Sequence, residues 1–199
     1  MNLPNKLTVL RLTLVPIFFI AFSLRFLGSE AAIIISTVLM VICYATAELS
    51  DLLDGKIARK NNLVTDLGKV LDPFADTLSH LTFFVCFLSY GIMPAWTFII
   101  IMWREFAILF MRMLIIKQGG KAMPANIFGK SKTVLYAFTT LLSIVFITAE
   151  TFAPAGNWNS IGGTVLYVLF ALSALASLAS FCIYLKDVLK SRILHSMTR

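Results

Sequence analysis

The sequence predicts an all-α, polytopic membrane protein with six transmembrane helices and both termini on the cytoplasmic side. Of its 199 residues, 59% are hydrophobic and 14% are charged, whereas soluble domains contain about 45–50% apolar and about 25% charged residues. A soluble chain of this length has too little interior to bury so many apolar side chains. No linker or low-complexity segment interrupts the chain, so we expect a single membrane domain over residues 1–199.

The apolar runs set the helices, because a helix needs about 20 residues to cross a bilayer. Pro16 lies inside the first run and is tolerated there, since neighbouring helices satisfy the freed carbonyl. The uncharged stretch 77–103 is long, but a turn sequence at 90–94 divides it into two helices. The second helix is expected to continue past Glu48 into an acidic segment. The six predicted helices cover residues 7–27, 31–47, 67–90, 94–117, 132–149 and 161–185.

Both ends of the chain are expected to stay in the cytoplasm. The segment Met1–Lys6 lacks the cleavage site of a signal peptide, so it is expected to be the retained start of the first helix. With six spans, fourteen of the 17 Lys and Arg residues fall on the side of the termini, only Arg25 falls on the opposite side, and Arg104 and Arg112 lie within a helix. By the positive-inside rule that basic side is cytoplasmic. The fourteen are Lys6, Arg11, Lys56, Arg59, Lys60, Lys69, Lys117, Lys121, Lys130, Lys132, Lys186, Lys190, Arg192 and Arg199.

The basic surplus and the cysteines carry no separate function. A net charge of +7 is an ordinary topology signal on a membrane protein, and no nucleic-acid module accompanies it. Cys43, Cys86 and Cys182 are an odd, widely spaced set within apolar runs. We expect them to be free, buried thiols rather than disulfide or zinc partners.

The acidic residues are concentrated in one place. Five of the ten lie between positions 51 and 76, in a chain that otherwise avoids acids. Asp51 and Asp54 are three residues apart, and Asp72 and Asp76 are four apart, so each pair shares a helical face. Two antiparallel helices joined by a short loop would bring the pairs together. Converging carboxylates repel one another, and hard cations that prefer oxygen ligands, such as Mg²⁺ or Mn²⁺, relieve that repulsion.

Written out, the segment is Asp51-x2-Asp54-Gly55-x2-Ala58-Arg59-x8-Gly68-x3-Asp72-x3-Asp76. It resembles the signature of the CDP-alcohol phosphatidyltransferase family, with all eight defining positions at the right spacing. The resemblance implies a six-helix, metal-dependent membrane enzyme that uses CDP-diacylglycerol and releases CMP. It also implies a homodimer. Small residues on the sixth helix suit close helix packing, either between subunits or within one subunit. These are Ser173, Ala176, Ser177 and Ser180.

Flanking segments resemble bacterial phosphatidylglycerophosphate synthases, which implies glycerol 3-phosphate as the acceptor. They are Pro4-Asn5-x2-Thr8-x2-Arg11, Arg104-Glu105, Arg112 and Gly129-Lys130-Ser131-Lys132-Thr133. Two positions depart from that pattern. Thr77 stands where such synthases have Lys, and Tyr136 stands where they have Gln. Both departures leave the metal motif intact and bear on the choice of acceptor.

The resemblance also implies a role for each motif residue. Two divalent ions would be held by Asp51, Asp54, Asp72 and Asp76, and Asp76 would be the general base. The CDP-lipid would contact Thr8, Asp54, Gly55, Ala58, Arg59 and Gly68. The acceptor phosphate would be bound by Arg112, Lys130 and Lys132. Ordinary structural roles stay open beside these: close helix packing for the small residues, capping for Thr8, and topology signal for the basic residues.

Arg104 and Glu105 lie deep in the predicted fourth helix, where charges normally pair inside the protein. A structural ion pair is therefore favoured over substrate contact, with Glu48 as one possible partner for Arg104.

The alternatives for function are the same chemistry with inositol phosphate, serine or phosphatidylglycerol as acceptor, a divalent-cation transporter, or a non-catalytic scaffold. The expected location is a plasma membrane, with the active site on the cytoplasmic side.

Overall fold

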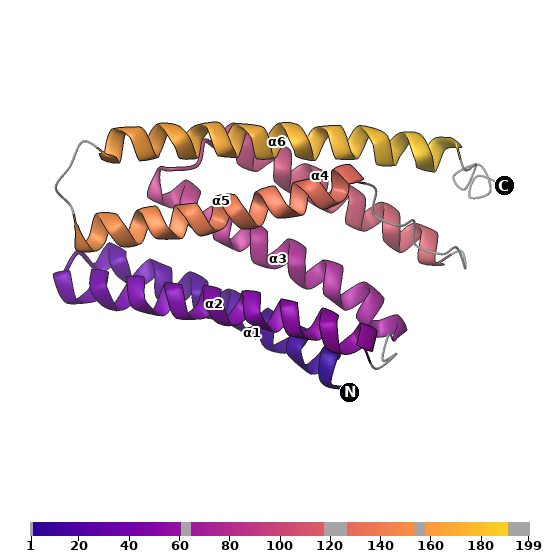
Figure 1. Cartoon of the computed structure of the whole chain (residues 1–199), viewed down its shortest axis with the longest axis horizontal. Helices are drawn as coiled ribbons and strands as arrows, with labels where there is room; N and C mark the ends of the chain where they lie inside the picture. Colours follow the sequence, from indigo (N-terminus) through magenta and orange to yellow (C-terminus); the bar gives the residue numbers. More distant parts are fainter. Residues whose placement is uncertain (1, 61–64, 118–126, 154–157, 191–199) are drawn as a thin grey trace.

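The computed structural model describes residues 2–60, 65–117, 127–153 and 158–190, and within these ranges every regular element is helical. The all-α prediction is therefore confirmed (Figure 1). The elements are α1 (Leu3–Ser23), the short 3-10 helix η1 (Leu24–Leu27), α2 (Glu30–Lys60), α3 (Asp66–Tyr90), α4 (Ala95–Lys117), α5 (Ile127–Phe152) and α6 (Trp158–Lys190).

Each helix follows its apolar run and most extend beyond it. The expected continuation of α2 through the acidic segment is confirmed, because the helix ends only at Lys60. At the other extreme, α5 begins five residues before the predicted start at 132. Hydropathy shows only where the apolar part of a helix ends. Backbone hydrogen bonding continues into the polar sequence at the membrane interface, so the predicted helices are shorter than the observed ones at these ends.

The turn between α3 and α4 has a clear local cause. Gly91 takes the left-handed conformation, with φ of 91°, which residues with a Cβ adopt only at a cost. Its backbone N–H bonds the carbonyls of Leu88 and Phe87, which closes the C-terminus of α3. At the other end of α3, the Thr65 hydroxyl accepts a hydrogen bond from Gly68 N at 3.1 Å. The predicted division of the long apolar stretch at 90–94 is confirmed.

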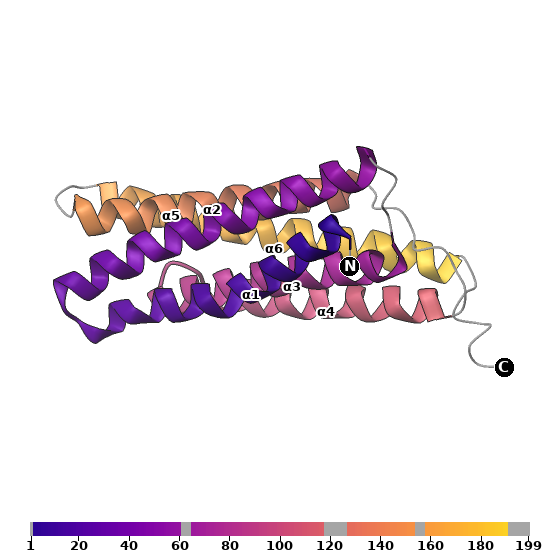
Figure 2. The same cartoon turned by 90° about the horizontal axis from the view of Figure 1, so that it is seen from below.

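The helices form an up-and-down bundle in which successive helices run in opposite directions (Figure 1). α1 packs against α2 and α3, and α6 packs against α4 and α5. Contacts of α3 with α4 and α5, and of α2 with α5, join these two groups. The start of α1 and the end of α6 lie at the same end of the bundle in both views (Figures 1 and 2). This arrangement agrees with an even number of crossings.

Within the described parts of the chain, four helical segments are long and apolar enough to cross a bilayer: Leu3–Leu27, Glu30–Ile57, Ser131–Phe152 and Ser160–Lys186. The protein is therefore a membrane protein. α3 and α4 fall short of that standard because they carry the polar side chains of the site described below, among them Asp72, Asp76, Arg104 and Glu105. The prediction of six spans with cytoplasmic termini stays a prediction.

The apolar core takes buried residues from each of the helices α1 to α6 and is rich in phenylalanine. Phe84, Phe87 and Phe170 are fully enclosed and contact one another through edge and tilted ring pairs. The thiol predictions hold for Cys43 and Cys86, which are free and buried. Cys182 is also free, but the expectation that it is buried is wrong, because it lies on an exposed face of α6.

Candidate active site

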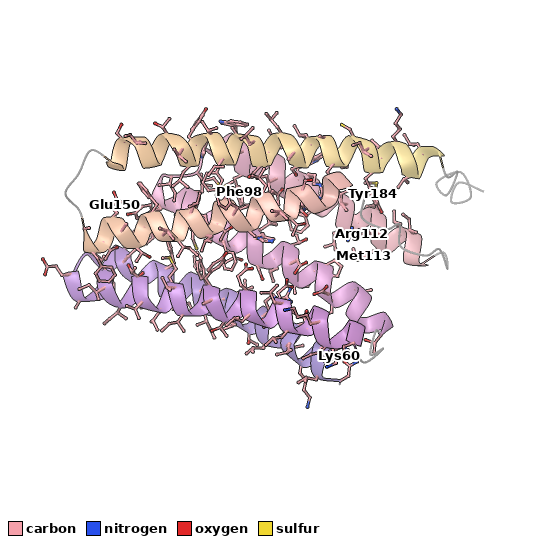
Figure 3. The ribbon with its side chains drawn as sticks, viewed as in Figure 1. Lys60, Phe98, Arg112, Met113, Glu150 and Tyr184 are labelled. Atoms are coloured by element: carbon pink, nitrogen blue, oxygen red, sulfur yellow. The ribbon has the colours of Figure 1, made fainter. Side chains whose placement is uncertain are left out.

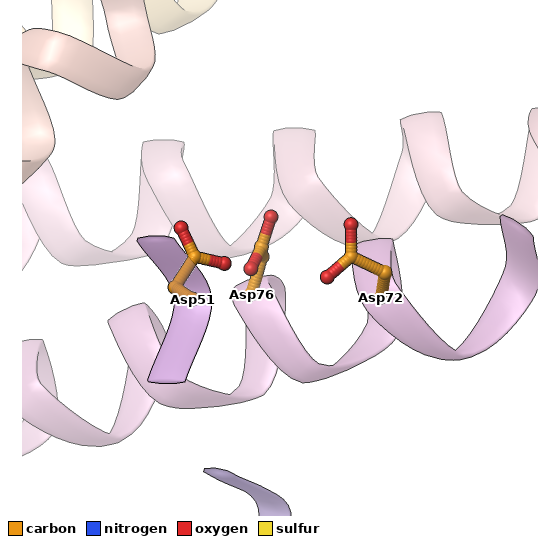
Figure 4. A group of neighbouring side chains, drawn as sticks. All are labelled: Asp51, Asp72 and Asp76. Carbon is orange, nitrogen blue, oxygen red and sulfur yellow. The ribbon is translucent and has the colours of Figure 1, made fainter. Parts of the chain in front are cut away.

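Three of the four motif aspartates converge on one point. Asp51 comes from α2, and Asp72 and Asp76 lie one turn apart on α3. Each offers a carboxylate oxygen, and these oxygens all lie within 4.8 Å of one another. Figure 4 shows the three carboxylates side by side, directed away from their helices into the same space. The convergence inferred from the spacing of the acids is therefore present in the fold.

Asp54, the fourth motif aspartate, faces α1 instead. Its side chain is 7% exposed, whereas those of Asp51, Asp72 and Asp76 are 45–48% exposed. Asp54 Oδ2 accepts a hydrogen bond from Thr8 Oγ1 at 3.3 Å. Asp54 is therefore buried against α1, in what we call the closed position, whereas the other three carboxylates are half-exposed and are called open.

Arg11 is the residue that ties the cluster together. Its Nη2 lies 2.6 Å from Asp51 Oδ1 and 2.5 Å from Asp54 Oδ2. Its Nη1 lies 3.5 Å from Asp72 Oδ1 and donates a short hydrogen bond to Asp76. The Arg11 side chain is only 3% exposed. One buried cation from α1 therefore contacts four carboxylates from α2 and α3 and offsets only part of their negative charge.

Sequence reasoning placed Arg11 in a flanking motif and among the topology cations, not in the site. The signal was present, however. Thr8 and Arg11 are three residues apart, so they share a face of α1, and that face continues through the buried Pro4 and Val15. A polar pair on the buried stripe of an apolar helix indicates a polar partner inside the bundle.

The cluster fits a divalent cation on two observations. Its open ligands are all carboxylate oxygens, the donor set that Mg²⁺ and Mn²⁺ prefer. In addition, Asp72 Oδ1 is buried and has no hydrogen-bond partner of normal geometry. A buried carboxylate oxygen in that condition is stabilised by a nearby cation. Asp51, Asp72 and Asp76 are the residues that can hold the ion.

The glycine of the motif at the start of α3 has a packing role. A Cβ added to Gly68 would lie 3.0 Å from Asn5 Oδ1 and 3.2 Å from Thr65 Oγ1. Asn5 Nδ2 donates to the same Thr65 hydroxyl at 3.1 Å. Gly68 therefore allows the N-terminal ends of α1 and α3 to approach one another, which is one of the alternatives left open by the sequence.

Three further residues are expected to contact the CDP-lipid: Gly55, Ala58 and Arg59. Gly55 is half-buried on α2 between the acidic cluster and the end of the helix. The side chains of Ala58 and Arg59 lie outside the described residues, as does that of Lys130. Their expected roles remain predictions.

A cavity of about 260 Å³ opens beside the cluster, between α3, α4 and α5. It joins two motif aspartates to three basic side chains, Arg104, Arg112 and Lys132. Two of the three expected acceptor residues, Arg112 and Lys132, therefore share a cavity with the metal motif. Figure 3 shows Arg112 near Tyr184, where α4 meets α6. The lining residues are Asp72, Pro73, Asp76, Thr77, His80, Arg104, Glu105, Ile108, Leu109, Arg112, Lys132, Thr133 and Tyr136.

Glu105 organises the cations of this cavity. Its Oε1 accepts a hydrogen bond from Arg104 Nη1 at 3.0 Å and from Lys132 Nζ at 2.5 Å. Arg104 Nη2 also donates to Ser180 Oγ at 2.8 Å. The expectation that Arg104 and Glu105 take part in ion pairs inside the protein is confirmed, and both residues also line the cavity. Sequence reasoning missed the link from Glu105 to Lys132, which lies 27 positions away on the next helix.

Contacts decide two possibilities that the sequence left open. Arg104 donates to Glu105 and Ser180, and Glu48, which lines a different cavity, is not its partner. The small residues of α6 do not form a free face for a second subunit. Ser173, Ser177 and Ser180 are buried within the protomer, where Ser173 contacts Thr139 of α5.

A second cavity, of about 220 Å³, lies on the other side of Asp76, between α2, α3 and α5. Asp76, His80 and Thr133 line both cavities, so they stand between them. The remaining lining residues of the second cavity are Arg11, Ala47, Glu48, Asp51, Leu52, Ser79, Phe83, Val134 and Ala137.

An apolar groove of about 470 Å³ follows the same two helices, α2 and α5, farther along the bundle. It is lined by Val41, Tyr44, Ala45, Leu141, Ile144, Val145, Thr148, Ala149 and Phe152. The second cavity and the groove thus place a charged end and an apolar end along one pair of helices.

Comparison with known proteins agrees with this site. Residues 1–185 match the sequence profile of the CDP-alcohol phosphatidyltransferase family. A protein of Bacillus subtilis (strain 168) named CDP-diacylglycerol–glycerol-3-phosphate 3-phosphatidyltransferase is 39% identical over 176 residues, which cover 83% of this chain and 90% of the relative. A Treponema pallidum (strain Nichols) protein of the same name is 32% identical over 94% of this chain and 88% of its own length.

A third relative bears a different name. A protein of Streptomyces coelicolor named cardiolipin synthase (CMP-forming) is 34% identical over 71% of this chain and 65% of its own length. The transporter and scaffold interpretations are set aside, because the profile covers nearly the whole chain and includes the aspartate cluster. The chain belongs to the CDP-alcohol phosphatidyltransferase family, and it is a phosphatidyl-transferring membrane enzyme.

Proposed function

We propose that the protein transfers the phosphatidyl group of CDP-diacylglycerol to glycerol 3-phosphate, giving phosphatidylglycerophosphate and CMP. One observation carries this proposal: the aspartates of the family motif and three buried or half-buried cations line the same cavity. The names of the Bacillus and Treponema relatives support the same acceptor.

Two divalent ions, Mg²⁺ or Mn²⁺, would be held by the motif aspartates. Asp51, Asp72 and Asp76 are the open ligands, and Asp54 would contribute from its closed position beside Arg11. When bound, such ions neutralise the negative charge of the pyrophosphate and stabilise the departing CMP. The protein itself supplies the fixed geometry, because buried Arg11 holds the carboxylates of α2 and α3 together.

Asp76 is the general base in this proposal. It stands between the two cavities, so its carboxylate can meet an acceptor on one side and a donor on the other. It would take the proton from the acceptor hydroxyl as that oxygen bonds to the lipid-side phosphorus. The bond from that phosphorus to the oxygen of CMP breaks in the same displacement. The proton therefore ends on Asp76 and the negative charge leaves with CMP.

The donor lipid fits the α2–α5 side of the site. Its pyrophosphate would lie by the carboxylates of the second cavity, and its acyl chains would follow the apolar groove toward the membrane interior. Thr8, Gly55, Ala58, Arg59 and Gly68 are the proposed contacts of the CDP group. The site would then face the cytoplasm at the plasma membrane, with all six helices crossing.

The acceptor cavity favours a phosphate monoester. Asp72 and Asp76 on one wall would be neutralised by the metal ions. On the rest of the lining, Arg104, Arg112 and Lys132 bring three positive charges and Glu105 removes one, which matches an acceptor with two negative charges. Lys130, from the same flanking motif, would add to this set. Serine has no phosphate group to match these positive charges, so the cavity supports serine less well as the acceptor. Phosphatidylglycerol remains the second candidate because of the Streptomyces relative's name.

A homodimer is part of the proposal through the family resemblance alone. Since the small face of α6 is buried within the protomer, a partner would contact one of the exposed apolar faces instead. Chemical cross-linking in detergent, followed by mass measurement, would report a single band at the monomer mass if this part is wrong.

The experiment offers purified protein CDP-diacylglycerol with labelled glycerol 3-phosphate, inositol phosphate, serine or phosphatidylglycerol, with Mg²⁺ or with EDTA. We expect labelled lipid and an equal amount of CMP with glycerol 3-phosphate and Mg²⁺ only. CMP release with a different acceptor would retain the family and reject the acceptor. Failure with every acceptor, in protein that keeps its helical content, would reject the proposed reaction.

A further inference from the structure

Lys132, on the wall of the acceptor cavity, is held from two sides. Glu105 Oε1 lies 2.5 Å from its Nζ. On the other side, Nζ lies 4.7 Å from the centre of the Tyr136 ring. Lys132 and Tyr136 are four residues apart on α5, so their side chains meet on one face of that helix. The ammonium therefore rests between a carboxylate and an aromatic face, and both attract a cation.

The Tyr136 ring is itself fixed by the protein core. It is fully buried. Phe84 meets it edge to face at 5.3 Å, and His80 does so at 5.6 Å. Phe84 in turn packs on Phe170 of α6 at 5.8 Å. The ring thus connects a buried aromatic cluster with the acceptor cavity.

Such a support matters for a lysine more than for most side chains. A lysine has a long flexible stem, and fixing that stem when a ligand binds costs conformational entropy. The cost is smaller when the protein already holds the side chain in place. Glu105 alone does not fix Lys132, because Oε1 is shared with Arg104. The Tyr136 ring restricts the ammonium from the other side, and Lys132 lines the acceptor cavity.

We infer that Tyr136 is a positioning residue for the acceptor: its ring face, rather than its hydroxyl, holds the Lys132 ammonium where the acceptor phosphate binds. This inference rests on the proposed function and adds a residue to it. Tyr136 is also one of the two positions at which this chain departs from the pattern of bacterial phosphatidylglycerophosphate synthases.

The test compares Tyr136→Phe, which keeps the ring, with Tyr136→Leu, which removes it. We expect Tyr136→Leu to raise KM for glycerol 3-phosphate about tenfold, within the range of a desolvated cation–π contact. KM for CDP-diacylglycerol and kcat should change less than about threefold. Tyr136→Phe should restore the wild-type KM. A merely structural role would instead lower thermal stability and kcat in Tyr136→Leu without a selective rise in KM for glycerol 3-phosphate.

A double substitution supplies a second readout. If the ring acts through Lys132, then Tyr136→Leu should add little to the KM of Lys132→Met, since the group it positions is already gone. An equal rise in KM for Tyr136→Phe and Tyr136→Leu would overturn the inference in favour of the hydroxyl, and unchanged KM in both would overturn it outright. Wild-type protein that fails to use glycerol 3-phosphate would instead reject the proposed function.

Discussion

Arg11 Nη2 and Asp54 Oδ2 lie 2.5 Å apart, and this contact joins the first helix to the most enclosed aspartate of the motif. The same guanidinium reaches the three open carboxylates. The geometry of the candidate active site therefore depends on a residue outside the motif by which the family is recognised.

Arg11→Ala should leave four carboxylates without their shared cation. Breaking a buried ion pair in this way costs about 3–5 kcal/mol. The melting temperature in EDTA should therefore fall well below that of the wild type, and Mg²⁺ should raise it more in the variant than in the wild type. Thermal unfolding in detergent measures both effects.

The matched control for that experiment is Arg25→Ala. Arg25 is also buried in the bundle but packs on the rings of Tyr90 and Phe22. Its loss should lower the melting temperature without making it depend on Mg²⁺. An equal response to Mg²⁺ in both variants would argue against a link between Arg11 and the metal cluster.

Thr8→Val should weaken the closed side of the site. The variant keeps the shape of the side chain but removes the hydroxyl that donates to Asp54 at 3.3 Å. A hydrogen bond to a charged group is worth about 1.5–3 kcal/mol, so we expect a loss of about tenfold or more in kcat/KM for CDP-diacylglycerol. Thr13→Val is the control, since Thr13 lies on the exposed side of the same helix and bonds only the Leu10 carbonyl. Similar losses in the two variants would contradict the role of Thr8.

Much of the fold could be predicted from the sequence, because a bilayer imposes helices of a known length. The break at Gly91 followed from local residues alone. The helix ends were harder to predict, as the start of α5 shows, because polar residues do not indicate where backbone hydrogen bonding stops. The number of crossings rests on α3 and α4, whose polar side chains weaken the hydropathy signal for a reason that only the site explains.

For the site, the sequence predicted contacts between close neighbours and missed those between distant helices. The convergence of Asp51 with Asp72 and Asp76 followed from helical spacing and a short connection. The pairing of Lys132 with Glu105 did not, because no periodicity within one helix reports which face a different helix presents to it. For the same reason, the small residues of α6 gave no indication whether they pack inside the protomer or between subunits.

Gly68→Ala should destabilise the bundle. The new methyl group would meet Asn5 Oδ1 at 3.0 Å, so the Asn5 side chain, which also bonds Thr65, would have to shift. Overpacking of this kind costs about 1–3 kcal/mol. Gly163→Ala is the control, because nothing lies within 4 Å of a Cβ at that helical position. Alanine there should be neutral or stabilising by up to about 1 kcal/mol.

Melting temperatures of the two glycine variants, measured in the same detergent, decide between packing and ligand contact at Gly68. A wild-type melting temperature for Gly68→Ala together with a raised KM for CDP-diacylglycerol would show that the glycine serves the nucleotide instead. The packing account would then be rejected.

Tyr90→Phe should affect stability and leave catalysis unchanged. The Tyr90 hydroxyl donates a short hydrogen bond to Glu150 of α5, and Arg25 lies 4.4 Å above its ring. Glu150 lies at the end of the bundle opposite Lys60 and Arg112 (Figure 3). Loss of the hydroxyl should cost about 1–3 kcal/mol of folding free energy. Tyr167→Phe, on an exposed position, is the neutral control. A fall in kcat for Tyr90→Phe would indicate coupling between the two ends of the bundle.

The most direct test of the central claim is Mn²⁺ binding to the purified protein, followed by the electron paramagnetic resonance signal of the free ion. We expect the wild type to bind Mn²⁺ and Mg²⁺ to displace it, and Asp51→Asn, Asp72→Asn and Asp76→Asn each to weaken binding at least tenfold. Glu30→Gln, which alters an exposed acid at the start of α2, should bind as the wild type does. Equal binding by the wild type and all three aspartate variants would show that the converging carboxylates do not hold the metal, and would contradict the account.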